Sequence, residues 1–177
     1  MQIVVPDEFK YLYVQDDERP VLKVPADVLL QKAREIERVT KKHHVLAENM
    51  MRIMRQANGV GLAAPQVGAS VRIVVMIADD RPLVLFNPKV LSATGSHIDE
   101  EGCLSIPGLY GDVERAAEVE IEALDRKGRK STWEMDGMSA RVVLHEIDHL
   151  DGILFTEKVN QATVYWQHPS KQATAAE

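Results

Sequence analysis

The sequence predicts a single α+β domain in which antiparallel hairpins pack around one central helix that carries an HExxH pattern. Two pairs of strand-like segments, each pair joined by a short polar turn, predict the hairpins. A nearly apolar helical segment follows them and must be buried. The 177 residues contain no internal repeat, low-complexity block or linker, so one domain over 1–177 is expected.

The N-terminal part is expected to contain a leader and one long helix. Residues 1–16 show no clear hydrophobic period, which predicts an irregular leader. Apolar residues between 27 and 57 recur at three- and four-residue spacing, which indicates a helix over that range. The pair Asn58-Gly59 is a suitable end for it, because glycine adopts the left-handed conformation that follows a helix.

Strands dominate the middle of the chain. RIVVMI (72–77) and PLVLF (82–86) flank an aspartate-containing turn and predict a first hairpin. EVEIEAL (118–124) alternates apolar with charged residues, and STWEM (131–135) follows a DRKGR turn, so a second hairpin is expected.

The C-terminal part begins with a second helix. The apolar spacing becomes helical over 138–150, and Gly152 follows as a suitable stop. ILF (153–155) predicts a short final strand, and residues 161–177 show little periodicity, which predicts a flexible tail.

Composition excludes several classes of function. The net charge of −6 does not suit a dedicated nucleic-acid binder, which usually carries a basic patch. No apolar run approaches 18 residues, so no membrane span is expected. Cys103 is the single cysteine, which rules out an intramolecular disulfide and favours a reducing, cytoplasmic setting.

HEIDHLDG (145–152) predicts a metal site. His145 and His149 are four residues apart and lie on one face of a helix, where two imidazoles can share one ion. Glu146 can reach the open side of that ion. A catalytic site of this kind needs about three protein ligands, so one ligand remains to be identified.

The third ligand is expected upstream. The metzincin pattern would place a histidine at position 155, but this chain has Phe155 there, and no later carboxylate lies on a convincing helix. Cys103, in the segment EEGCLSIPG, is the favoured candidate because a thiolate binds zinc or ferrous iron well. The alternatives that remain open are His43, His44 and His97.

NGVGLAAPQVG (58–68) predicts a tight loop in which the backbone is accessible. It lacks the GxxxxGK[ST] pattern of a phosphate loop. The Gln66 amide could donate a hydrogen bond to a developing oxyanion, and the alternative is an ordinary surface glutamine.

Taken together, GVGLAAPQ (59–66), EGCLS (101–105) and HEIDHLDG (145–152) resemble the three motifs of the peptide deformylase family, in the same order and with similar separation. The resemblance covers residues 17–158. It implies that Cys103 is the third ligand beside His145 and His149, with water in the fourth position of one divalent metal ion. The family's usual ion is Fe(II), which zinc, nickel or cobalt can replace.

The resemblance also implies an activity, which is hydrolysis of the N-formyl group from formyl-methionyl nascent chains. Glu146 would be the general base, and the Gln66 amide and the Leu104 N–H would stabilise the oxyanion. Further residues are expected to bind the substrate through the backbone or to line the methionine pocket: Gly59, Val60, Gly61, Gly102, Met138 and Val142.

One residue departs from the family pattern. Leu144 stands where the family usually has glutamine, before the first histidine. This leaves two alternatives to a deformylase, which are a metal-binding relative without activity and an endopeptidase of the HExxH type. The short tail does not resemble the C-terminal helix with which some members dock on the ribosome, so ribosome contact is not favoured.

Overall fold

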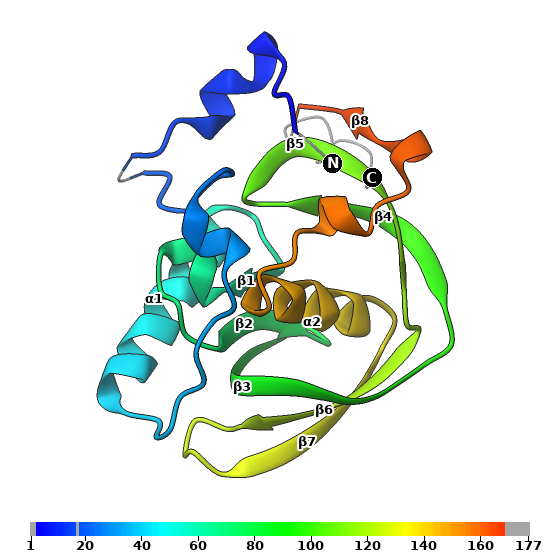
Figure 1. Cartoon of the computed structure of the whole chain (residues 1–177). Coiled ribbons are helices and arrows are strands. Elements are labelled where there is room, and N and C mark those ends of the chain that lie inside the picture. Colours follow the sequence, from blue (N-terminus) through cyan, green and yellow to red (C-terminus); the bar gives the residue numbers. More distant parts are fainter. Residues whose placement is uncertain (1–2, 17, 169–177) are drawn as a thin grey trace.

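A computed structural model describes residues 3–16 and 18–168, which form two antiparallel sheets and two α-helices (Figure 1). The larger sheet has the order β1-β2-β3-β6-β7, with strands Gly61–Ala63, Ile73–Ala78, Arg81–Thr94, Glu118–Leu124 and Lys130–Asp136. The smaller sheet has the order β4-β5-β8, with strands His97–Cys103, Ile106–Arg115 and Tyr165–Trp166. The helices are α1 (Lys41–Gln56) and α2 (Gly137–Leu150). Short 3-10 helices are η1 (Asp7–Tyr13), η2 (Asp27–Leu30), η3 (Ala64–Val67), η4 (Phe155–Glu157) and η5 (Gln161–Thr163).

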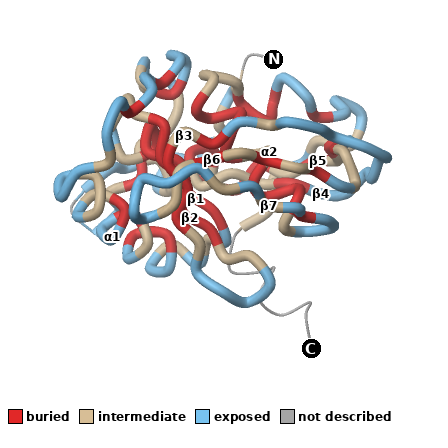
Figure 2. The backbone as a smooth tube through the Cα atoms, turned by 90° about the horizontal axis from the view of Figure 1, so that it is seen from below, coloured by how far each residue is buried: buried red, intermediate tan, exposed pale blue. Residues whose placement is uncertain are grey.

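The larger sheet is covered on both faces by helices. Successive side chains of a strand point to opposite faces. Val74 and Met76 of β2 therefore pack with α2, whereas Ile73 and Val75 pack with α1. Buried backbone gathers in the middle of the molecule around β1, β2 and α2 (Figure 2). This packing explains why β2 is a continuous apolar run.

Helix α2 lies between the two sheets (Figure 1). It packs on β1, β2 and β7, and the Arg141 side chain reaches the smaller sheet, where Nη1 donates to the Val113 carbonyl at 2.9 Å. The predicted class, one small α+β domain with antiparallel sheets, is confirmed. Among the described residues, no helix is both long enough and apolar enough to cross a membrane.

Both predicted hairpins are present as β2-β3 and β6-β7. Asp79 and Asp80 make the first turn with φ values of 47° and 61°, the left-handed conformation that short hairpin turns require. The predicted helix over 138–150 is α2.

The helix predicted over 27–57 is too long, because α1 begins only at Lys41. Residues before it are held extended by Asn87, whose side chain accepts from the Ile36 N–H and donates to the Ile36 carbonyl, each at 2.8 Å. Thr40 then provides the N-cap of α1. Of the residues before Thr40, 27–30 form η2, and the segment around Ile36 packs as an extended chain, so the apolar spacing there does not belong to an α-helix.

The ends of the chain also differ from prediction. Residues 153–155 form no strand, and η4 begins at Phe155. The leader is not wholly irregular, since it contains η1. In the predicted tail, η5 is followed by β8, which pairs with β5, and the Trp166 ring lies 5.2 Å from the Phe9 ring. The prediction of a flexible tail is thus wrong for 161–168, and residues 169–177 lie outside the described part.

Candidate active site

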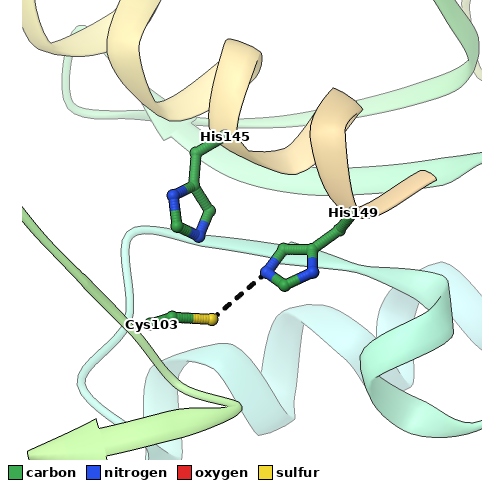
Figure 3. A group of neighbouring side chains, drawn as sticks. All are labelled: Cys103, His145 and His149. Atoms are coloured by element: carbon green, nitrogen blue, oxygen red, sulfur yellow. Dashed lines mark hydrogen bonds between the residues drawn. The ribbon is translucent and has the colours of Figure 1, made fainter. Parts of the chain in front are cut away.

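Cys103, His145 and His149 come together although the cysteine lies more than 40 residues from the histidines in sequence. Cys103 ends β4, and both histidines project from α2 toward it (Figure 3). One ligand atom from each side chain lies within 4.8 Å of the others, and Cys103 Sγ is 3.2 Å from His149 Nε2. The other predicted histidine candidates are elsewhere. His43 caps α1, His44 packs against Phe86, and His97 begins β4.

This donor set fits a transition-metal ion. One sulfur and two imidazole nitrogens suit zinc or ferrous iron and do not suit magnesium or calcium. Burial raises the pKa of the Cys103 thiol, but the neighbouring His149 and His145 lower it more, so the net pKa lies well below the ordinary value. The sulfur is therefore ready to act as a thiolate, which is the form that ligates metal.

Glu101 orients one of the histidines, and the sequence analysis did not identify it. Its Oε2 accepts a hydrogen bond from His145 Nδ1 at 2.9 Å, which turns His145 Nε2 toward the cluster. The same carboxylate accepts from Arg115 Nε at 2.8 Å and Arg141 Nη1 at 2.7 Å. Glu101 precedes Cys103 by two positions in β4, so both lie on one face of the strand. That spacing is the signal that could have identified it.

Arg115 joins Glu101 to α2 in a buried ion network. Its guanidinium also donates to Asp148, which accepts from Lys158 Nζ at 2.7 Å. Asp148, which lies between the two histidines in sequence, is therefore part of this network.

Replacing Arg115 by leucine is expected to lower the free energy of unfolding by about 3–5 kcal/mol, because it leaves buried carboxylates without their charge partner. Chemical denaturation would measure the change. The matched control is Arg129→Leu, whose side chain pairs with Asp125 in an exposed turn and should matter little. A loss no larger than that of the control would contradict the proposed role of the network.

Gln66 is buried beside the cluster, with 2% of its surface exposed. Its Oε1 accepts from the Ala63 N–H at 2.8 Å. This leaves Nε2 directed toward Ser105 Oγ at 3.2 Å and Cys103 Sγ at 3.9 Å. The alternative of an ordinary surface glutamine is therefore wrong.

Glu146 lies beside the glycine loop and is buried, with 4% of its surface exposed. One carboxylate oxygen, Oε2, has no hydrogen-bond partner among the described residues. Burial raises the pKa of Glu146 to about 6. A Cβ atom on Gly61 would lie 2.5 Å from Glu146 Oε1, so only glycine allows the backbone to approach this carboxylate.

The remaining predicted residues surround the same region. Gly59 lies opposite Leu104, because a Cβ atom on Gly59 would be 2.7 Å from Leu104 Cδ1. Gly102 lies against the Tyr110 ring. Val142 is buried and approaches Gly61, whereas Val60 and Met138 are exposed by 53% and 61%. A cavity of about 610 Å³ between α1, β3 and β7 includes none of these residues.

A family model, a relative in sequence and two solved structures all relate this chain to deformylases. The model of the polypeptide deformylase family matches residues 18–164. A peptide deformylase of Desulfitobacterium hafniense is 45% identical over 143 residues, which cover 81% of this chain and 95% of that protein. The crystal structure of peptide deformylase from Thermus thermophilus is similar with a TM-score of 0.77 and 43% identity, covering 81% of this chain and 86% of that one. A peptide deformylase from Synechococcus elongatus, in complex with actinonin, has a TM-score of 0.77 and 39% identity, with 80% of each chain covered.

Proposed function

The chain belongs to the polypeptide deformylase family, whose members are hydrolases that remove the N-formyl group of formyl-methionyl nascent peptides, and we propose that its own residues perform this reaction as follows. The observation that supports the proposal most is the convergence of three potential metal ligands beside a buried carboxylate with a free oxygen.

Cys103, His145 and His149 would hold one divalent metal ion, with Fe(II) as the proposed native ion and zinc, nickel or cobalt as substitutes. Three protein ligands leave one position open, which is typical of a catalytic site. When bound, the metal supplies a Lewis acid that lowers the pKa of water and stabilises negative charge on oxygen. Helix α2, which provides both histidines, is in this proposal the metal-binding helix at the centre of the domain.

Glu146 is the proposed general base. Its raised pKa allows it to accept a proton from the attacking water and to deliver that proton to the leaving amine at neutral pH. Its unpartnered Oε2 is available for that exchange. The carbon-nitrogen bond of the formyl amide breaks as the amine receives the proton, and formate is released.

The Gln66 amide and the backbone N–H of Leu104 are the proposed oxyanion donors. The hydrogen bond from the Ala63 N–H fixes the orientation of the Gln66 amide, so Nε2 rather than Oε1 is directed toward Cys103. Donors that are already oriented require no rearrangement as charge develops, which is why such groups are effective.

The substrate is proposed to bind as an added strand. β1 lies at one edge of the larger sheet and β4 at one edge of the smaller sheet. The contact of Gly59 with Leu104 indicates that the glycine loop before β1 and the turn after β4 lie close together. An extended peptide can pair with such edges through its backbone, using Gly59, Val60, Gly61 and Gly102. Met138 and Val142, with Val60, would then contact the methionine side chain.

We propose that this arrangement tolerates Leu144. It is half-buried and packs with the core under α2, while the ligands and Glu146 keep their positions on the same helix. The relatives and solved structures named above are deformylases, so neither an endopeptidase nor an inactive relative is favoured. A cytoplasmic location, little ribosome contact and no nucleic-acid binding stay predictions.

The direct test is formate release from N-formyl-methionyl-alanine by protein loaded anaerobically with ferrous iron, or with nickel as a more stable substitute. We expect rapid turnover that a chelator abolishes, because the reaction needs the metal. Absence of turnover by folded, fully metallated protein would contradict the proposal, and Leu144→Gln would then show whether this departure is the cause.

A further inference from the structure

Three buried polar side-chain atoms of the described residues have no hydrogen-bond partner: Tyr13 Oη, Glu146 Oε2 and His149 Nδ1. A buried polar group without a partner is costly, and native proteins retain such groups mainly where a water, ion or ligand completes them. Two of the three atoms belong to the candidate active site. The third, Tyr13, lies outside residues 18–164, where the family model matches, and takes no part in the reaction proposed above.

The fold brings Tyr13 to the strand pair that carries Cys103. η1, which ends at Tyr13, packs on β5. Phe9 anchors η1, because its ring lies 5.2 Å from the Trp166 ring and fills the space beside Gly108. Gly108 is two residues from Ile106, the partner of Cys103 in the β4-β5 ladder. The anchor of η1 is therefore close to Cys103 in the sheet.

Residues 22–24 lie along the site. The Leu22 N–H donates to the Gln66 carbonyl at 2.8 Å, and the Val24 N–H donates to the Ser105 carbonyl at 3.1 Å. Thus η1 contacts β5, and Leu22 and Val24 contact the segments that carry Gln66 and Ser105 beside Cys103.

The surroundings keep the Tyr13 hydroxyl protonated. Burial raises its pKa most, and the negative charge of the nearby Cys103 thiolate raises it further. The hydroxyl is therefore a neutral hydrogen-bond donor at any pH at which the protein would work.

We propose that Tyr13 is an additional substrate-binding residue, whose hydroxyl donates a hydrogen bond to a backbone carbonyl oxygen of the bound formyl peptide. This inference rests on the proposed function of the site. In this proposal the Tyr13 hydroxyl, which has no hydrogen bond to a described residue, serves peptide binding and takes no part in the bond-breaking step.

The test is Tyr13→Phe, which removes one oxygen and keeps the ring. We expect the KM for N-formyl-methionyl-alanine to rise about 3- to 10-fold, with kcat within about 2-fold of wild type. This pattern is expected because the lost hydrogen bond is made equally to the bound substrate and to the transition state. The matched control is Tyr11→Phe. Tyr11 belongs to the same helix, and its hydroxyl contacts His168 on the surface, so neither constant should change.

A second measurement does not depend on turnover. Cys103 is the only cysteine, so its alkylation by iodoacetamide in metal-free protein reports on this site alone. The peptide concentration that protects Cys103 should rise by a similar factor in Tyr13→Phe and stay unchanged in Tyr11→Phe. Equal protection of wild type and Tyr13→Phe would overturn the inference even if the enzyme is active. A difference in protection without any turnover in wild type would support the binding role and refute the proposed reaction.

Discussion

Replacing Glu146 by glutamine is expected to lower kcat for formate release by about 100- to 10,000-fold, the usual contribution of a general acid-base group. Glutamine has nearly the same shape but cannot take a proton from water. The side chain is buried beside Gly61 and does not belong to the ligand cluster, so metal content should remain near that of wild type. Steady-state kinetics and metal analysis of the same preparation measure both effects.

A suitable control for this variant is Glu134→Gln on the exposed face of β7, which removes the same charge far from the ligands and should leave kcat unchanged. Glu146→Gln with near wild-type turnover would show that another group moves the proton. Low turnover with low metal content would instead assign Glu146 a role in holding the ion.

Replacing Cys103 by alanine is expected to weaken metal binding by more than about 100-fold, since loss of a residue that only supports a ligand already costs about 10- to 100-fold. Alanine removes the thiolate, the only negatively charged donor among the three residues. Both histidines remain on α2, and two neutral ligands hold a divalent ion poorly. Titration with nickel under competition with a chelator measures the affinity.

The comparison variant is His43→Ala, because His43 caps α1 and does not belong to the cluster. It should bind metal as wild type does. If Cys103→Ala kept the affinity of wild type, the third ligand would have to be another residue, and the proposed site would be wrong. In Cys103→Ala, activity and metal content are expected to fall together. In Glu146→Gln, activity is expected to fall while metal content stays near that of wild type.

Elements with strong local patterns could be predicted from the sequence. The β6-β7 hairpin shows a clear alternation of apolar and polar residues and a short turn. Helix α2 shows apolar residues at helical spacing on most of its sides. In both cases the residues that are neighbours in sequence are enough to predict the element. β4 and β5 were not predicted. The first four residues of β4 are exposed and give no alternation of apolar and polar positions, and the position of β4 depends on pairing with β5. Pairing of that kind is set by contacts that no short window contains.

The same distinction applies to the site. Two ligands four residues apart on one helix, and a carboxylate next to one of them, follow from helical geometry and are readable in the sequence. The third ligand was indicated by the family resemblance, and the approach of β4 to α2 places Cys103 3.2 Å from His149. The support of His145 by Glu101, and of Glu101 by Arg115 and Arg141, needs side chains from β4, β5 and α2 together.

The amino-acid sequence alone predicts the α+β class, the two hairpins, the metal-ligand pattern on the second helix and the family resemblance. Four features depend on contacts that form only on folding: the start of α1, the joining of residues 161–168 to the fold, the burial of Gln66 and the position of Tyr13 near the site. The physical reason is the range of the interactions. Periodicity and turn chemistry act between neighbours in sequence, whereas burial, ion networks and strand pairing depend on segments that meet only when the chain has folded.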